Sequence, residues 1–129
     1  MPWDTSDLRS DTIYQEGTCG FLFNASGNLS RGQAVRIIDD ETVASTIIGS
    51  NGIGIVDHSV LHGDECTVYV AGNITNACSP ESITPNQLLY ASSNGFVSAI
   101  RYSSERPMAI SIDTFEKVTT NNIGKVLLI

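Results

Sequence analysis

Residues 57–65, with the sequence DHSVLHGDE, hold the densest group of chemically active side chains. Asp57, His58 and Ser59 are the residue types of a hydrolase triad, but consecutive residues of an extended chain point to alternating faces and cannot assemble one. His58 and His62 have the i, i+4 spacing of metal ligands on a helix. Strand-like runs flank the segment and a glycine interrupts it, so we expect a loop with solvated histidines and no metal.

Three other segments resemble known sites only superficially. The glycine-rich stretch 49–54 is not followed by a helix N-terminus that could bind phosphate, so we expect an Asn51-Gly52 turn instead. Asp39–Glu41 lacks the alternating oxygen spacing of a calcium loop and is expected to be a polar turn. Asn94-Gly95 lies between two short apolar runs and predicts a hairpin. The sequence therefore gives no basis for a cofactor, a metal site or an enzyme.

The three cysteines, Cys19, Cys66 and Cys78, cannot all pair within one chain. Their separations do not match the short gaps of a zinc site or a redox dithiol. We expect free thiols in a reducing compartment, with a Cys66–Cys78 bridge as the alternative.

The chain has 129 residues and a formal net charge of −7, with 41% hydrophobic and 16% charged residues. This length fits one domain with its own core, and the composition is too apolar for a disordered chain. The basic residues are scattered, so we expect no nucleic-acid partner. We expect no secretory signal and no membrane segment, because no apolar run approaches the roughly 20 residues of a membrane-spanning helix.

From residue 17 onward, short strand-like runs alternate with turns. Residues 32–38 alternate at the period of a half-buried strand, and similar runs recur every 8–12 residues or so, a spacing that favours a small all-β fold. We therefore predict a mainly β protein with a single small β-barrel, β-clip-like or sandwich domain over residues 17–129, preceded by an extended N-terminal arm over residues 1–16. Asp113–Glu116 resembles a helix capping box, so at most one helical turn is expected there.

Two parts of the chain resemble each other at a spacing of 54 residues, which grows by one further along. We interpret them as two similar halves, about residues 32–70 and 86–129, each closing with a strand. Two unrelated hairpins are the alternative, but a duplicated unit suits a closed barrel better than a solenoid, which needs at least three repeats. The matched residues are Gln33 with Gln87, Val43 with Val97, and Gly54-Ile55 with Ala109-Ile110.

The N-terminal arm, residues 1–16, differs from the rest of the chain. It is polar, has no sustained period, and contains isolated large apolar residues, namely Trp3, Leu8, Ile13 and Tyr14. Such a segment cannot form its own core. Two interpretations stay open from the residues alone: the arm packs back on its own domain, or it docks on another chain.

Six short motifs follow one another along the sequence: Gly32–Val35, Gly54–Val56, Thr67–Gly72, Asn94–Val97, Ala109-Ile110 and Gly124–Ile129. Taken in this order, the set resembles the head decoration, or capsid cement, proteins of tailed phages. The resemblance covers about nine-tenths of the chain. Val56 departs from it, because Ala is frequent at that position in the family, and three cysteines are unusual there.

The resemblance implies a structural virion protein that is not an enzyme and has no cofactor. It implies synthesis in the host cytoplasm and assembly as a homotrimer on the outer surface of the phage head, without contact to nucleic acid or membrane. The partner is the major capsid protein, whose neighbouring subunits are clamped so that the capsid is stabilised. The arm then binds the capsid, and its contact residues are Pro2, Trp3, Leu8, Ile13 and Tyr14.

Two other classes of function are the alternatives. Another virion structural β domain, in a tail tube, fibre or baseplate, would share the strand pattern. A small ligand-binding β module would need exposed aromatic side chains gathered on one face, and the available ones are spread along the sequence. Those aromatic residues are Trp3, Tyr14, Tyr69, Tyr90 and Tyr102.

Overall fold

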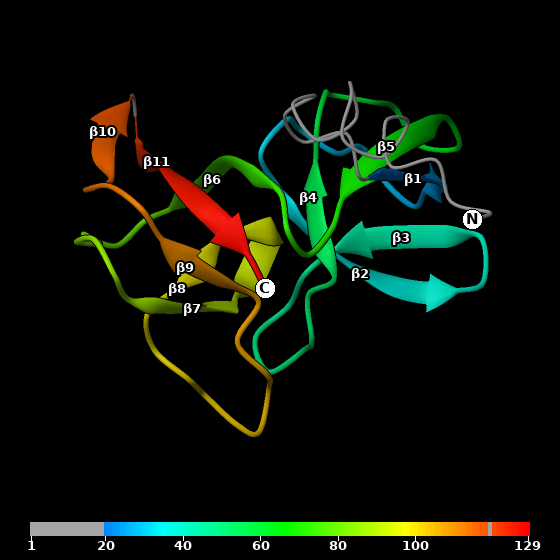
Figure 1. Ribbon diagram of the computed structural model, residues 1–129. Coiled ribbons are helices and arrows are strands. Elements are labelled where there is room, and N and C mark those ends of the chain that lie inside the picture. The colour runs from blue at the N-terminus through cyan, green and yellow to red at the C-terminus, as the bar shows by residue number, and fades with distance from the viewer. Residues whose placement is uncertain (1–19, 119) are drawn as a thin grey trace, which may run out of the picture.

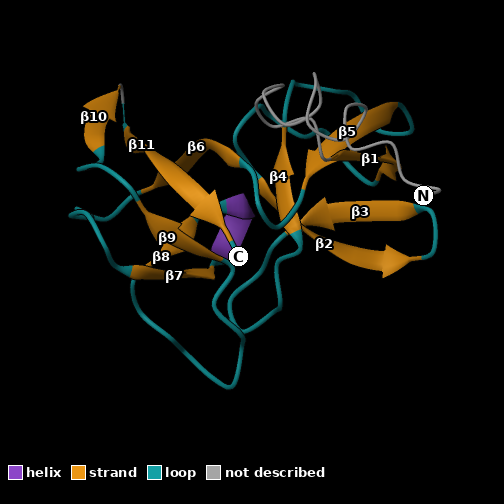
Figure 2. Ribbon diagram, viewed as in Figure 1, coloured by secondary structure: helices purple, strands orange, loops and turns teal. Residues whose placement is uncertain are grey.

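The computed structural model describes residues 20–118 and 120–129, and this part of the chain is almost entirely β (Figures 1 and 2). The predicted mainly β fold is confirmed: a closed barrel of β1–β5 is followed by a six-stranded, curled sheet of β6–β11. The predicted arm, residues 1–16, lies outside the described residues. The strands are β1 (Gly20–Ala25), β2 (Ala34–Asp39), β3 (Thr42–Ser45), β4 (Gly54–Val56), β5 (Glu65–Tyr69), β6 (Ile74–Ser79), β7 (Leu88–Ala91), β8 (Val97–Ser98), β9 (Ala109–Ser111), β10 (Glu116–Val118) and β11 (Asn121–Leu128).

The barrel closes because its first strand pairs on both sides. The strand order is β1-β3-β2-β4-β5, and β1 pairs antiparallel with β5 and parallel with β3. The predicted polar turn at Asp39–Glu41 is confirmed: it joins β2 to β3, and Asp39 Oδ1 accepts a hydrogen bond from the Glu41 N–H at 2.9 Å. A closed barrel leaves no unpaired edge among its own strands.

The second sheet has the order β10-β11-β9-β7-β8, and β6 pairs with β11. It stays open between β6 and β8, where a side chain takes the place of a strand ladder. The Glu81 carboxylate accepts hydrogen bonds from the Ser98 hydroxyl and, at 3.2 Å, from the Ala99 N–H. The Glu81 carbonyl accepts a bond from Asn122 Nδ2 at 2.6 Å, so one residue ties β8 to β11.

The two sheets repeat the same pairing register. Ile37 faces Val43 in the barrel, and Ala91 faces Val97 in the second sheet. The turns before β2 and β7 also match, since Ser30 N–H donates to Gln33 Oε1 and Thr84 N–H donates to Gln87 Oε1. The matched strands are β1 with β6, β2 with β7, β3 with β8, β4 with β9 and β5 with β11. The matched units include residues 20–31 and 74–85, which lie outside the two halves compared in the sequence.

Strands β2 and β4 each serve two cores, and this joins the barrel to the second sheet. Val35 and Val56 point into the barrel, where the core also contains Val43, Cys66 and Val68. The alternate residues Ala34 and Ile55 belong to the core of the second sheet. The predicted half-buried pattern of residues 32–38 therefore fails at the start of β2, because both faces of that strand are buried. The second core is completed by Ala77, Ile83, Leu89, Ala91, Val97, Met108, Ala109, Phe115, Val126 and Leu128.

Two turn predictions need comment. Asn94-Gly95 does join the antiparallel strands β7 and β8, and both residues have positive φ, 55° and 75°. The Asn51-Gly52 turn is wrong: the positive φ falls on Gly49, at 83°. Gly52 is needed instead for close packing, because a Cβ there would lie 2.6 Å from Met108 Sδ.

No helical turn forms at Asp113–Glu116, where at most one was expected. Residues 116–118 form β10 and pair with residues 121–123 of β11. Asp113 Oδ1 accepts a hydrogen bond from the Lys125 N–H at 2.8 Å, so its carboxylate binds a strand and not a helix N-terminus. Tertiary pairing has overridden a weak local signal. Within the described part of the chain, no helix is long and apolar enough to cross a membrane.

Candidate functional site

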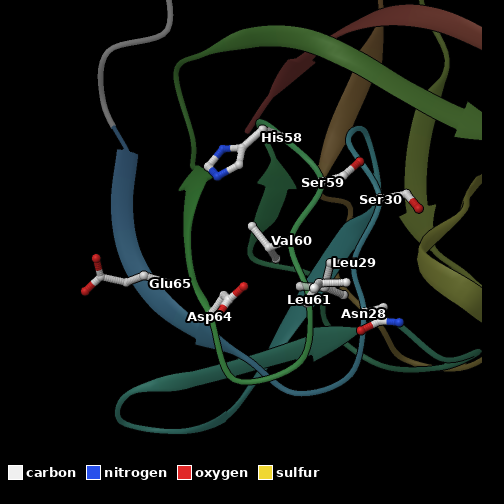
Figure 3. Close-up of a pocket in the computed structure, with 9 residues that line it drawn as sticks. All are labelled: Asn28, Leu29, Ser30, His58, Ser59, Val60, Leu61, Asp64 and Glu65. Atoms are coloured by element: carbon white, nitrogen blue, oxygen red, sulfur yellow. The ribbon is translucent and has the colours of Figure 1, made fainter.

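The segment 57–65 forms a loop that lies over the turn before β2 and borders a shallow pocket of about 500 Å³ (Figure 3). His62 is part of this packing: its Nδ1 accepts a hydrogen bond from the Gly27 N–H at 2.8 Å, and its own N–H donates to Asn28 Oδ1 at 2.9 Å. Ser59 Oγ accepts a bond from the Arg31 N–H at 3.1 Å. These residues hold the loop in place.

The loop does not bring a nucleophile and a base together. His58 Nδ1 contacts the carboxylate of its neighbour Asp57, and Figure 3 shows the His58 ring and the Ser59 hydroxyl pointing to different sides. Among residues 20–118 and 120–129, no three His, Cys, Asp or Glu side chains gather closely enough to hold a metal ion. The pocket is therefore a surface hollow between loops, with no assembled chemistry.

Cys66 and Cys78 are free thiols. Cys66 is fully buried in the barrel core, and burial, with the Asp57 carboxylate as a second cause, raises the pKa of its thiol. Burial also raises the pKa of Cys78, which lies beside Gly32 at the junction of the two sheets. Both thiols are consequently poor nucleophiles at neutral pH. Cys19 lies outside the described residues, as do the predicted capsid contacts Pro2, Trp3, Leu8, Ile13 and Tyr14.

A row of apolar side chains, exposed at its two ends and partly buried between them, crosses the outer face of the second sheet. Ile74 is paired with Leu127, Leu127 with Ile110, and Ile110 with Leu88, so one rung of the sheet runs through β6, β11, β9 and β7. Directly paired residues point to the same face of a sheet. Ile74 is 54% exposed and Leu88 is 47% exposed. We call these four residues the outer row.

A second exposed apolar group lies at the loops that join β3 to β4 and β8 to β9, which both descend at the bottom of Figure 1. Each side chain of this group is at least half exposed. The loops touch, because Asn51 Oδ1 accepts a hydrogen bond from the Arg106 N–H at 2.8 Å. The group, called the loop tip below, consists of Ile47, Ile48, Ile100 and Tyr102.

A buried carboxylate shapes the loop tip. Glu105 is 1% exposed and accepts hydrogen bonds from the Tyr102 N–H at 2.9 Å and the Ser103 N–H at 2.7 Å. Burial raises the pKa of Glu105, but these backbone hydrogen bonds and the nearby Arg101 charge lower it by more than burial raises it. The pKa of Glu105 therefore lies below its ordinary value. The ionised form of Glu105 therefore holds the loop.

Sequence reasoning missed both apolar surfaces. As sequence alone, the apolar run 42–48 predicts one extended strand, whereas β3 ends at Ser45 and the two isoleucines that follow turn outward. The adjacent pair Ile47-Ile48 before a glycine-rich stretch was the available signal for the loop tip. The outer row had no comparable signal, because β6 reads as the largely polar ITNACS and the row exists only through cross-strand register.

Comparison with models of known protein families finds no match, and comparison with curated proteins finds none either.

Proposed function

We propose that this chain is a structural virion protein that binds the outside of a phage head and stabilises the capsid by clamping neighbouring major capsid subunits. The observation that carries the proposal is the combination of a rigid β domain with two exposed apolar surfaces, the outer row and the loop tip. Monomeric soluble proteins rarely expose contiguous apolar patches, and such patches often mark sites of interaction with another protein. The ordered motifs of the sequence support the same function.

The acidic character of the chain supports a place on the outer surface of a particle. A formal net charge of −7 keeps decorated particles apart by repulsion and disfavours contact with packaged DNA. In this proposal the β domain forms a homotrimer on the head. The arm reaches the major capsid protein, where an extended segment can add main-chain hydrogen bonds to a strand edge.

The test is binding of the purified chain to heads that lack their own decoration. Trp3→Ala removes the largest apolar side chain of the arm, and loss of a buried aromatic anchor worth about 2 kcal/mol should weaken attachment more than about tenfold. Thr5→Ala, a polar substitution in the same arm, is the matched control and should leave binding unchanged. Deletion of residues 1–15 should leave a folded domain that no longer binds heads.

Two results would contradict the part that this proposal gives to the arm. Unchanged attachment after the deletion would show that the arm does not bind the capsid, and loss of folding would show that the arm belongs to its own core. Electron micrographs of particles labelled through this protein separate the proposal from a tail or baseplate role, since head decoration places the label over the head.

A further inference from the structure

The outer row has a counterpart in the barrel, and the two rows differ in what covers them. The matching rung of the barrel consists of Gly20, Tyr69, Ile55 and Ala34. There Ala34 and Ile55 are completely buried and, with Tyr69 beside them, pack against the core of the second sheet. The same rung in the second sheet keeps two of its four side chains about half exposed.

We propose that the outer row is a contact surface for a second copy of this chain, which places the acidic outer face of its barrel against it. The chain itself supplies the precedent, because the second sheet already covers Ala34 and Ile55 of the matching rung in the barrel. The inference deepens the proposed function and rests on the homotrimer assumed there.

The distribution of charge favours contact between the barrel of one copy and the second sheet of another over contact between two barrels. Residues 37–100 contain seven carboxylates and neither lysine nor arginine. The barrel, residues 20–69, carries six carboxylates against Arg31 and Arg36, whereas residues 74–129 carry four carboxylates against four cations. Two barrels facing each other would bring acidic surfaces together, and such like-charge contact costs several kcal/mol. A barrel facing the second sheet avoids this cost.

The second sheet also places a cation beside the outer row. Lys125 lies two residues before Leu127 on β11, is exposed, and therefore points to the same face. Its neighbour on β6 is the uncharged Asn76, and on its other side the Asp113 carboxylate accepts a hydrogen bond from the Lys125 N–H. An acidic partner surface would pair with this ammonium at the border of an apolar contact.

The outer face of β1 has the complementary character. Leu22 is 63% exposed, and it borders a shallow groove of about 170 Å³. The other residues that line the groove are Phe23, Asn24, Asp40, Glu41 and Glu65. An exposed leucine beside three carboxylates offers an apolar contact for the outer row and opposite charge for Lys125.

The two surfaces belong to different sheets, which lie on opposite sides in Figure 1, so the contact is heterologous. In a pair of copies joined by a heterologous contact, one copy keeps a free outer row and the other keeps a free barrel face. Further copies can therefore add until a ring closes. A ring of three copies is the homotrimer that the proposed function includes.

The experiment measures the mass of the full chain by light scattering over a concentration series reaching the millimolar range. The wild type should reach three chain masses. Ile74→Asp with Leu88→Asp on the outer row, or Leu22→Asp on the barrel face, should raise the concentration needed for assembly about a hundredfold. Ile47→Asp with Ile100→Asp at the loop tip changes equally exposed side chains and should leave the trimer intact. Circular dichroism checks that every variant stays folded.

Mixing the row variant with the barrel-face variant gives the sharpest result. Each retains one intact surface of a different kind, so an equimolar mixture should form a pair of two chains and no ring. A wild type that stays a single chain, a loop-tip variant that loses the trimer, or a mixture that forms no pair would each overturn the inference. Head binding is measured separately. If the protein stays a single chain and binds heads, the result supports the proposed function and contradicts the inference. If it forms the trimer and does not bind heads, the result supports the inference and contradicts the proposed function.

Discussion

The ring of Phe115 packs directly on Gly124 of β11, so a β carbon on that glycine would overlap the aromatic carbons. At the matching places in the barrel stand Val60, which is smaller than Phe115, and Cys66, which is larger than Gly124. The main chains agree: the Val60 N–H donates to Leu29 O, and the Phe115 N–H donates to Ile83 O, both at 2.9 Å. The two units thus divide the same space differently between the two side chains.

Gly124→Ala should therefore destabilise the protein by about 1–3 kcal/mol through overpacking. Phe115→Val in the same chain frees the space that the new methyl group needs, so the double variant should be at least about 1 kcal/mol more stable than the sum of the two single effects predicts. Denaturant unfolding measures the cycle. Lys125→Ala, an exposed neighbour on the same strand, is the control. Additive effects would show that the two residues do not share one space.

Glu81→Ala should cost about 1–3 kcal/mol, because it leaves the Ala99 N–H and the Ser98 hydroxyl without their acceptor at the open side of the second sheet. Hydrogen exchange at the Ala99 amide should accelerate more than exchange in the barrel. Glu116→Ala removes an exposed carboxylate from the same sheet and should be neutral. Equal acceleration in both sheets would mean that Glu81 acts on the whole molecule.

Glu105→Gln should remove part of the acid sensitivity of the protein. The pKa of Glu105 is lowered in the folded state, so its contribution to the free energy of unfolding is present above its ordinary pKa and is lost as the pH falls through the lowered value. The wild type should lose stability between about pH 5 and pH 3 more steeply than the variant. Glu116→Gln, at an exposed position, should keep the wild-type slope. Identical slopes for the wild type and Glu105→Gln would contradict this assignment.

Alkylation should modify Cys66 and Cys78 of the folded protein at different rates. In a Cys19→Ser background, Cys66 should stay unmodified at neutral pH while the protein is folded, because its pKa is raised and its side chain is fully buried. Cys78, which is half-buried, should react faster than Cys66 but slower than a free thiol in solution. Mass spectrometry of digested samples reports each site. Rapid modification of Cys66 under native conditions would show that the barrel opens readily.

The all-β class and several turns were predictable because their signals are local. Asn94-Gly95 fixes a hairpin through backbone preference alone, and Asp39–Glu41 is polar enough to be a turn in any context. The repeated pattern of Gln33 with Gln87 was visible for the same reason, since both side chains bond to the turn three residues earlier.

What could not be predicted depends on contacts between distant parts of the chain. Ala34 and Val35 are both buried because β2 lies between two cores, and no pattern within residues 32–38 reveals the second one. The outer row follows from the register of four strands, and the loop tip from two loops about fifty residues apart. Ile47 and Ile48 look like core residues until the end of β3 is known.

The sharing of β2 and β4 between two cores has a consequence for synthesis. The barrel can close once the chain has emerged as far as Tyr69, since its five strands are then complete. At that moment Ala34 and Ile55 have no cover, because the strands that bury them are still to be translated. A growing chain whose barrel has closed would therefore expose a bare apolar flank until β11 leaves the ribosome, and in that interval neighbouring nascent chains could associate through it.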